Sequence, residues 1–374
     1  MFSPKMDFLA KILKVILVRR KIAPRAASVF VFAGLLELLQ GAAGFVGAKT
    51  CGSCHPTEFA RQSPGAHAHA LSRAADHPLA ASFPLGVRLT RPPAYRFEFS
   101  RDGGSFRVRI SDGINIMDLP LEWAFGAGKQ AVTFVTKINK DWYVEHYSTF
   151  YPALRAWGAT PGQLEIRPVS LPEAAGRVYS ISDPQSGIAG CFECHSTGPV
   201  SFDSSGQADT TELGVRCETC HGPGAAHSKS PTRKNIRNPG HLSAQQLNEF
   251  CGRCHRPPAT SGEKVDWNFS WNIRHQPLYL NQSACFRKSG GALTCLTCHN
   301  PHESAKSKPA AFYNSRCIAC HSTTAVRPKP VCEAGKASNC IDCHMPLVSP
   351  QASLRFTNHW IGVYTGGSRL KPTR

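Results

Sequence analysis

A pattern of two cysteines spaced two residues apart and followed at once by a histidine occurs seven times in the 374-residue chain. Thiols and imidazoles bind zinc, paired thiols form redox-active disulfides, and C-x-x-C-H is also the pattern at which c-type haem is attached. We number the motifs as sites 1 to 7 in chain order. They are CGSCH (51–55), CFECH (191–195), CETCH (217–221), CGRCH (251–255), CLTCH (295–299), CIACH (317–321) and CIDCH (340–344).

The constant thiol spacing and the constant histidine favour haem over the other two chemistries. Two residues between the thiols let one short turn present both sulfurs to one edge of a porphyrin, and the next residue places its imidazole under the iron. A four-ligand zinc site or a disulfide framework demands no such regularity. The motifs therefore predict seven covalently bound haem c groups, attached through Cys51, Cys54, Cys191, Cys194, Cys217, Cys220, Cys251, Cys254, Cys295, Cys298, Cys317, Cys320, Cys340 and Cys343. The expected proximal iron ligands are His55, His195, His221, His255, His299, His321 and His344.

Nine histidines lie outside the motifs, which is enough to give every iron a second imidazole. His227 closes CHGPGAAH and His302 closes CHNPH, and after such short turns we expect each imidazole to reach a neighbouring haem. His67 in SPGAHAHAL and His359 in RFTNHWIGV are also expected distal ligands. An exposed surface histidine is the alternative interpretation in every case. Candidates with less local support are His146 on an expected strand, His69, His275, His77 and His241.

Two cysteines, Cys285 and Cys332, lie outside the motifs. Both fall in the haem-dense half of a chain that we expect to be exported, and disulfides persist in oxidising compartments. A structural disulfide between them is therefore predicted, with two free thiols as the alternative.

The N-terminal residues resemble a secretory leader. A stretch rich in Lys and Arg precedes the apolar run SVFVFAGLLELLQGAAGFVGA, and small residues at Val46, Gly47 and Ala48 predict a leader over 1–48 that is cleaved after Ala48. An uncleaved membrane anchor is the alternative. No later segment approaches the roughly 20 apolar residues that a membrane span requires, so we expect a protein of the periplasm or the cell surface.

The formal charge of +18 at pH 7 is the remaining compositional signal. A basic chain can bind nucleic acid, but export argues against that partner, and the propionates of seven haems would offset much of the charge. The expected partners are proteins that donate and accept electrons, such as a membrane-associated quinol oxidase or other cytochromes.

The motifs divide the chain unevenly. Site 1 lies in a short segment, 49–89, and sites 2 to 7 crowd into 186–374, where haem is expected to replace much of the protein core. Between them, residues 90–185 contain YRFEFSR, SFRVRIS, QAVTFVTKI and DWYVEHYSTFY, which predict two hairpins. The predicted fold class is a haem-packed multihaem cytochrome of short helices and loops with an inserted small antiparallel β module.

Several stretches resemble the bacterial multihaem c-type cytochromes of the superfamily that includes the tetrahaem electron acceptor of ammonia oxidisers, hydroxylamine oxidoreductase and pentahaem nitrite reductase. The resemblance implies that His67, His227, His302 and His359 are distal ligands. No motif ends in Lys, unlike one motif of the nitrite reductases, so the resemblance of scaffold does not imply their activity. The stretches are CGSCHPTEFARQSPGAHAHA, WAFGAGKQAVTFV, YVEHYSTFY, TPGQ, GVRCETCHGPGAAH, CLTCHNPHE, CIDCHMP and FTNHWI.

Three functions are compatible with seven haems in one chain. The leading hypothesis is electron transfer through closely packed haems that are mostly bis-histidine ligated, without catalysis. The second is a reductase or oxidase of a small nitrogen or sulfur compound at one haem with an open face. The third is a subunit of a conductive filament, in which the chain would form oligomers.

Overall fold

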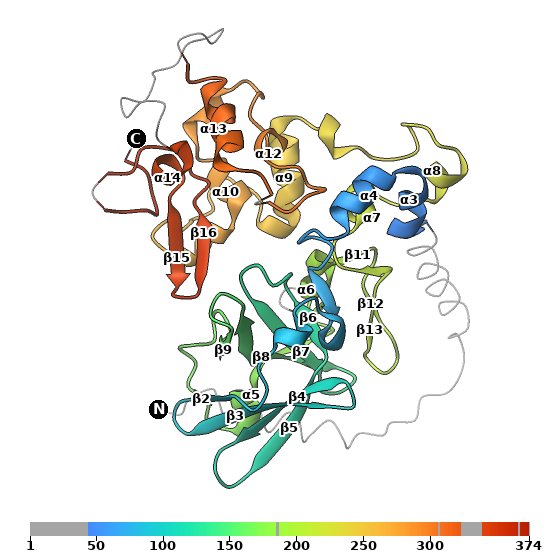
Figure 1. The fold of residues 1–374 in the computed structure, drawn as a ribbon, viewed down its shortest axis with the longest axis vertical. Helices are drawn as coiled ribbons and strands as arrows, with labels where there is room; N and C mark the ends of the chain where they lie inside the picture. Colours follow the sequence, from blue (N-terminus) through green and yellow to red (C-terminus); the bar gives the residue numbers. More distant parts are fainter. Residues whose placement is uncertain (1–43, 185–186, 306, 323–338, 366, 374) are drawn as a thin grey trace, which may run out of the picture. The chain divides into compact units, whose positions relative to one another are not determined.

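The computed structural model describes residues 44–184, 187–305, 307–322, 339–365 and 367–373 (Figure 1). Residues 44–374 group into one unit by their contacts. Most of the expected leader, and Cys332, lie outside the described residues. Within the described residues, no helix is long and apolar enough to span a membrane.

The first of two antiparallel sheets contains the hairpin expected from YRFEFSR and SFRVRIS. Alternate residues of its second strand face the protein interior, so that Tyr95, Phe97 and Phe99 are buried while the residues between them are exposed. Gly103 and Gly104 connect the hairpin with φ angles of 51° and 92°, values that favour glycine. The strand order is β2 (Arg88–Arg91), β3 (Tyr95–Asp102), β4 (Ser105–Ser111) and β5 (Ile116–Leu121).

The second sheet contains the other expected hairpin, β7–β8, and extends beyond the predicted β module. Its strand β1 comes from the predicted site 1 segment and pairs with β6, so the two regions share one sheet. The strand order is β1 (Leu71–Arg73), β6 (Trp123–Phe125), β7 (Val132–Lys137), β8 (Trp142–Tyr151) and β10 (Gly176–Ser180), with β9 (Ala156–Ala159) paired to β8.

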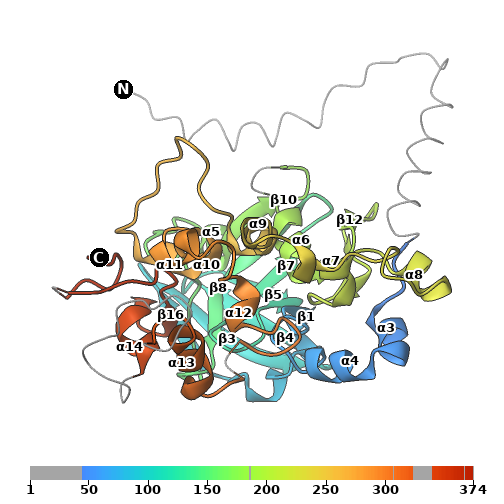
Figure 2. The same ribbon diagram turned by 90° about the horizontal axis from the view of Figure 1, so that it is seen from above.

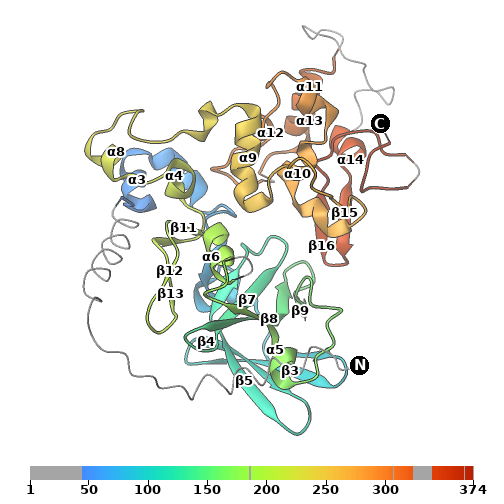
Figure 3. The same ribbon diagram turned by 180° about the vertical axis from the view of Figure 1, so that it is seen from behind.

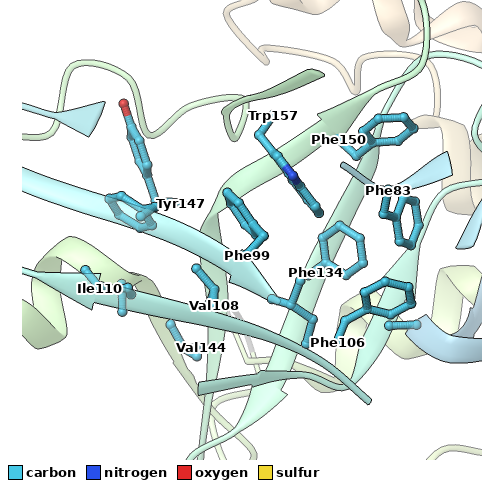
Figure 4. Packing of buried hydrophobic residues seen from close by; sticks show 14 of the residues in the cluster. Phe83, Phe99, Phe106, Val108, Ile110, Phe134, Val144, Tyr147, Phe150 and Trp157 are labelled. Carbon is cyan, nitrogen blue, oxygen red and sulfur yellow. The ribbon is translucent and has the colours of Figure 1, made fainter. Parts of the chain in front are cut away.

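An aromatic core joins the two sheets (Figure 4). The ring of Phe99 stacks on that of Trp157 with centroids 4.0 Å apart, and Phe83 packs edge-on against Phe106, Phe134 and Phe150. Each fully buried aromatic or aliphatic side chain contributes about 1.5–3 kcal/mol to folding. This part of the chain therefore has a conventional hydrophobic core that needs no cofactor.

The rest of the chain consists of short helices and two-stranded ribbons, as expected for the six-site region. The helices are α3 (Ala48–Cys54), α4 (Pro56–Gln62), α5 (Leu171–Ala175), α6 (Ala189–His195), α7 (Cys217–His221), α8 (Ala225–Lys229), α9 (Ala244–His255), α10 (Gln276–Leu280), α11 (Ala284–Lys288), α12 (Cys295–Cys298), α13 (Ala310–Ile318) and α14 (Cys340–His344). The short 3₁₀ segments are η2 (Ala74–Asp76), η3 (Ala80–Ser82), η4 (Pro239–His241) and η5 (Ser270–Arg274). The ribbons pair β11 (Ser196–Thr197) with β14 (Glu212–Leu213), β12 (Ser201–Phe202) with β13 (Ala208–Asp209), and β15 (Leu347–Gln351) with β16 (Leu354–Thr357).

Two small apolar clusters pack against the helices of the motif region. One contains Ile273, Leu278, Tyr279 and Val348, with Trp267 and Trp360 packed against it. The other joins Phe192 of α6 to Trp123 and Phe125 of the second sheet. Elsewhere the cysteines of the motifs are half-buried or exposed. The contrast with the β sheets is the one expected if a bound group supplies most of the apolar surface in this region.

Candidate haem-binding sites

Each attachment motif lies on a helix or at the end of one. Sites 2, 3 and 7 occupy α6, α7 and α14, and site 4 forms the last turn of α9. Residues three apart share one face of a helical turn. The local structure therefore presents both thiols of a motif to the same side, as attachment to one porphyrin edge requires.

The Nδ1 atoms of several motif histidines are held by backbone carbonyls. His195 Nδ1 lies 2.9 Å from Ala70 O, His221 Nδ1 lies 2.9 Å from Arg237 O, and His344 Nδ1 lies 2.9 Å from Gly362 O. A proton on Nδ1 makes each of these bonds and leaves the lone pair of Nε2 available. This is the arrangement of a metal-ligating histidine, because the outer hydrogen bond sets both the tautomer and the ring orientation.

Two of the expected distal ligands show the same arrangement. His227 Nδ1 lies 3.1 Å from Thr232 O, and His359 Nδ1 lies 3.0 Å from Thr357 O. Burial and the adjacent His299 lower the pKa of His359 to about 4. Its imidazole is therefore neutral near pH 7, the form that binds a metal.

Four motif histidines face a histidine from another part of the chain. An imidazole nitrogen lies about 2 Å from a bound first-row metal, so two imidazoles on opposite faces of one metal have ring centroids about 6 Å apart. The observed centroid distances are 6.1–6.3 Å. The pairs are His55–His227 at 6.3 Å, His67–His255 at 6.2 Å, His221–His302 at 6.1 Å and His299–His359 at 6.2 Å.

These pairs cover sites 1, 3, 4 and 5. His227 follows site 3 in the chain but faces the histidine of site 1, and His302 follows site 5 but faces that of site 3. Each distal candidate thus lies opposite the histidine of a different motif. The assignment of these imidazoles to iron stays a prediction.

Two other histidines have protein partners that occupy their ring nitrogens. His77 Nε2 lies 2.9 Å from Gly126 O, and its Nδ1 accepts a hydrogen bond from Leu79 N. His146, a predicted distal candidate, is fully buried in β8, with Nε2 2.7 Å from Thr136 Oγ1. Both positions are those of structural histidines.

The remaining candidates, His69, His241 and His275, lie in three different settings. His69 makes a hydrogen bond to the backbone of Ser63. His241 ends η4 and is exposed, and His275 lies between η5 and α10 with its Nδ1 buried and without a protein partner among the described residues. Among the described residues, none of the three forms a ring pair of the spacing seen at sites 1, 3, 4 and 5.

The thiols of different motifs lie against one another. Thiols that lie close enough to shift one another's pKa join site 1 to site 3, site 2 to site 4, site 4 to site 5, and site 6 to site 7. The pairs are Cys51–Cys217, Cys194–Cys254, Cys251–Cys295 and Cys317–Cys340. In addition, Cys251 raises the pKa of Cys220 through charge repulsion, and Cys298 does the same to Cys317, after the larger effect of burial on each. These proximities link site 3 to site 4 and site 5 to site 6.

The helices that carry these sites lie side by side. Figures 1 and 3 show α3 of site 1 next to α7 of site 3, and Figure 2 shows α13, which ends in site 6, beside α14 of site 7. Short helices that each contribute one attachment motif thus bring the motifs together without a large apolar interface between them.

A cavity of about 370 Å³ lies against site 7. Its walls combine apolar side chains with one cation, Arg369, and one carboxylate, Asp342. The apolar side chains suit a flat apolar ring, and the cation suits an anionic propionate. The lining residues are Ile341, Asp342, Met345, Leu347, Thr357 and Arg369. Arg369 would be the counter-charge for a propionate, and sequence reasoning missed it because its basic side chain lies far along the chain from the motif.

Cys285 lies on α11 close to sites 5 and 6. Burial raises the pKa of Cys298 and of Cys317, and Cys285 adds a smaller increase to each. Its expected disulfide partner, Cys332, lies outside the described residues, so that pairing stays a prediction. Sequence reasoning also passed over Glu218, an acidic residue between the two thiols of site 3 whose side chain is buried. A charged residue inside an attachment motif is the signal that could have drawn attention to it.

Sequence comparisons match parts of the chain to cytochromes. Residues 173–222, which contain sites 2 and 3, match the family model described as cytochrome c554 and c-prime. The C-type polyheme cytochrome OmcC of Geobacter sulfurreducens is 30% identical over 135 residues, which is 32% of this chain and 17% of that protein. The multiheme cytochrome MtrA of Shewanella baltica is 26% identical over 181 residues, which is 36% of this chain and 53% of that protein.

Two solved structures were also found. The outer cell wall cytochrome OcwA aligns with a TM-score of 0.49 and 16% identity, over 85% of this chain and 79% of that chain. An undecaheme cytochrome from the S-layer of Carboxydothermus ferrireducens aligns with a TM-score of 0.45 and 17% identity, over 95% of this chain and 60% of that one. Parts of the chain are thus similar to multihaem c-type cytochromes, and the family model falls on residues that contain two of the C-x-x-C-H motifs.

Proposed function

We propose that the protein is an exported heptahaem cytochrome that carries electrons between redox partners and catalyses no reaction itself. The observation that carries this proposal is the set of four imidazole pairs, spaced for two ligands on one iron, within a continuous series of adjoining attachment sites. When bound, haem c supplies a one-electron iron centre that is anchored through thioethers.

In this proposal, the four ring pairs are the axial ligands of sites 1, 3, 4 and 5. Each pair would hold one haem iron between two imidazoles, and a haem held in this way would exchange electrons without binding a substrate at the iron. The backbone carbonyls at His221, His227 and His359 hold the outer nitrogens of these rings. They keep each ring oriented and make its ligating nitrogen more basic.

The contacts between motifs support an order for the sites. Because both thiols anchor one edge of a porphyrin, thiols in contact place the edges of two attached groups together. The contacts support a line of sites 1, 3, 4, 5, 6 and 7, from which site 2 branches at site 4. Each step of this line connects two motifs, and no motif stands apart from it.

The proposed location is the periplasm or the cell surface, which rests on the secretory character of the N-terminal sequence. Redox proteins are the proposed partners. Site 1 and site 7 end the line, and site 2 ends the branch, so one or more of these three sites would exchange electrons with those partners. Site 2 is held against the β sheet, because His195 packs edge-on against Phe125 in β6 with ring centroids 5.2 Å apart.

The first experiment counts the haems. The full chain is produced in a host with a c-type haem maturation system, and the mass of the intact protein is measured after denaturation, when thioether-bound haem stays attached. We expect a mass that exceeds that of the polypeptide by seven haem groups. A mass with fewer haems on a folded, homogeneous product would contradict the proposed stoichiometry.

The second experiment tests the ligand pairs. His227→Ala removes the imidazole that faces His55, and we expect one iron in seven to become high-spin in the ferric electron paramagnetic resonance spectrum. His241→Ala is the matched control and leaves the spectrum as in the parent protein. If His227→Ala changes no iron signal while the protein retains its haems, the assignment at site 1 is wrong.

A second candidate function is favoured by one observation. Sites 2 and 7 lack a ring pair of this spacing among the described residues, which leaves room for an open axial position and for a reductase or oxidase of a small nitrogen or sulfur compound. Addition of cyanide, nitrite or hydroxylamine to the oxidised protein tests it. A spectral shift in one iron would support this candidate, and the absence of any shift would exclude it.

A further inference from the structure

Residues 44–48, which immediately precede site 1, are bound to the fold by their backbone; we call them the N-terminal strap. Val46 N and Gly47 N donate hydrogen bonds of 2.8–3.1 Å to the carboxylate of Glu218. Ala48 N donates to Glu212 Oε2 at 2.9 Å, and Gly44 O accepts a bond of 2.9 Å from Ala225 N. The strap is therefore tied along its length to residues 212–225.

Glu218 is buried at the centre of these bonds. Its side chain is 3% exposed, and one carboxylate oxygen also accepts a hydrogen bond of 2.7 Å from Gly224 N. A buried carboxylate requires such charge-assisted bonds to offset its loss of hydration. If the strap were absent, the buried carboxylate of Glu218 would lose the donors of Val46 and Gly47.

The strap also fits its position closely. A Cβ atom added to Gly44 would lie 2.9 Å from Cβ of Pro223, so only glycine fits there without a shift. Gly47 has a φ of 81°, a value that favours glycine, and Ala48 is 2% exposed.

These observations bear on where the leader ends. The small residues at Val46 and Ala48 suggested cleavage after Ala48, but that cut would remove the entire strap. Gly41 and Ala43 offer small residues at the third and first positions before an alternative bond, which also fits the pattern of leader cleavage.

We propose that a leader peptidase cleaves the bond between Ala43 and Gly44, and that the mature protein keeps the strap. Water adds across this peptide bond, which leaves a carboxylate on Ala43 and an amino group on Gly44. The retained strap connects α3 of site 1 to the segment that carries site 3. The thiols of Cys51 in site 1 and Cys217 in site 3 lie close together. The inference rests on the proposed export of the chain.

The test is the N-terminal residue of the exported, haem-loaded protein, determined by mass spectrometry of the intact chain and of its N-terminal peptide. We expect the chain to begin at Gly44. A chain that begins at Lys49, at any other residue after Gly44, or at Met1 overturns the proposal. The same intact mass counts the haems, so a chain with too few haems that begins at Gly44 would contradict the proposed function alone.

Two leader variants sharpen the test. Ala43→Tyr places a large side chain at the first position before the cut and should prevent processing, so that the leader stays attached. Ala42→Tyr, at a position where large residues are tolerated, is the matched control and should be processed as the parent chain is. If Ala43→Tyr is processed at the same bond and to the same extent as the parent chain, Ala43 does not occupy the first position before the cut and the proposal is wrong.

A third variant tests the anchor. Glu218→Gln removes the charge that holds the strap, and we expect an aminopeptidase to trim residues 44–48 at least tenfold faster than in the parent protein. Glu165→Gln, an exposed site, is the control. Equal trimming rates in the parent and in Glu218→Gln would show that Glu218 does not hold the strap, and the N-terminal residue of the parent protein is measured independently of this variant.

Discussion

The histidines of this chain have two different hydrogen-bonding patterns. In the first pattern, Nδ1 donates to a backbone carbonyl and Nε2 remains available, as at His221, His227 and His359. In the second pattern, Nε2 is itself bound by the protein, as at His77 and His146. Residue type alone does not separate the patterns, because the nitrogen that is used depends on which carbonyl or hydroxyl lies nearby.

His146 is expected to make the folding stability of the protein sensitive to acid. Burial lowers the pKa of His146 from 6.5 to about 3. Its Nδ1 is buried without a hydrogen-bond partner among the described residues, so a proton added there would have no acceptor. Below pH 6.5 the unfolded chain binds a proton that the folded chain does not, so folding stability from this residue is lost as the pH falls from 6.5 toward 3. The loss amounts to on the order of 3 kcal/mol at pH 4.

The measurement compares melting temperatures, followed by far-UV circular dichroism, at pH 7 and pH 4. His146→Gln keeps a donor for Thr136. We expect its melting temperature to fall less between pH 7 and pH 4 than that of the parent protein. His241→Gln, at an exposed site, should show the parent dependence. Identical pH dependence in His146→Gln and the parent would refute the assignment of the effect to His146.

At the scale of elements, short helices carry the C-x-x-C-H motifs. Most of them are a single turn or two, too short to be stable alone, so their stability must come from tertiary contacts, from caps and from the group they bind. The helix α9 is the longest of those that carry a motif, and a capping box at its start supports it. Ser243 Oγ accepts from Gln246 N, and the Gln246 side chain accepts from Ser243 N.

Removal of this cap gives an expected loss of stability without loss of haem. Ser243→Ala leaves donors at the start of α9 unsatisfied and should cost about 1 kcal/mol, a drop of roughly 2–4 °C in melting temperature. Ser243→Asp keeps an acceptor and should melt within a degree or so of the parent protein. Equal melting of Ser243→Ala and the parent would mean that tertiary contacts alone hold the helix.

The two hairpins could be predicted from sequence because alternation and turn glycines are local signals. The pairing of β1 with β6 could not, since β1 has only three residues and its partner lies far along the chain. The same limit applies to the ring pairs. Local context indicated that His227 and His302 reach a neighbouring site, but the identity of that site depends on contacts between distant motifs.

At the scale of the whole molecule, site 4 is the junction of the proposed electron path. Its thiols contact those of sites 2 and 5 and lie close to site 3. A change in the reduction potential at this site should therefore affect more transfers than the same change at an end of the line. A shift of about 59 mV in the reduction potential of one site changes the equilibrium constant of a one-electron transfer tenfold.

Matched methionine variants test the junction. His67→Met at site 4 and His227→Met at site 1 should each raise the potential of one haem, because Met/His ligation gives higher potentials than paired histidines. In stopped-flow reduction, we expect His67→Met to slow equilibration among the remaining haems by about tenfold or more, for a shift of about 59 mV or above. His227→Met should leave that phase unchanged, and equal effects of the two variants would contradict the branched order.

The imidazole pairs also determine the order in which the sites can be completed during synthesis of the chain. Synthesis proceeds from the N-terminus, so Cys51 and His55 emerge long before His227, which faces His55 in the folded protein. The last histidine pair to form is that of His299 and His359, near the C-terminus. Until His227 has been synthesised, site 1 therefore has only the histidine of its own motif, His55. Small molecules or chaperones have access to the site during this stage. Premature termination after site 1 would leave that site permanently in this state, whereas loss of residues after His359 would spare all four pairs.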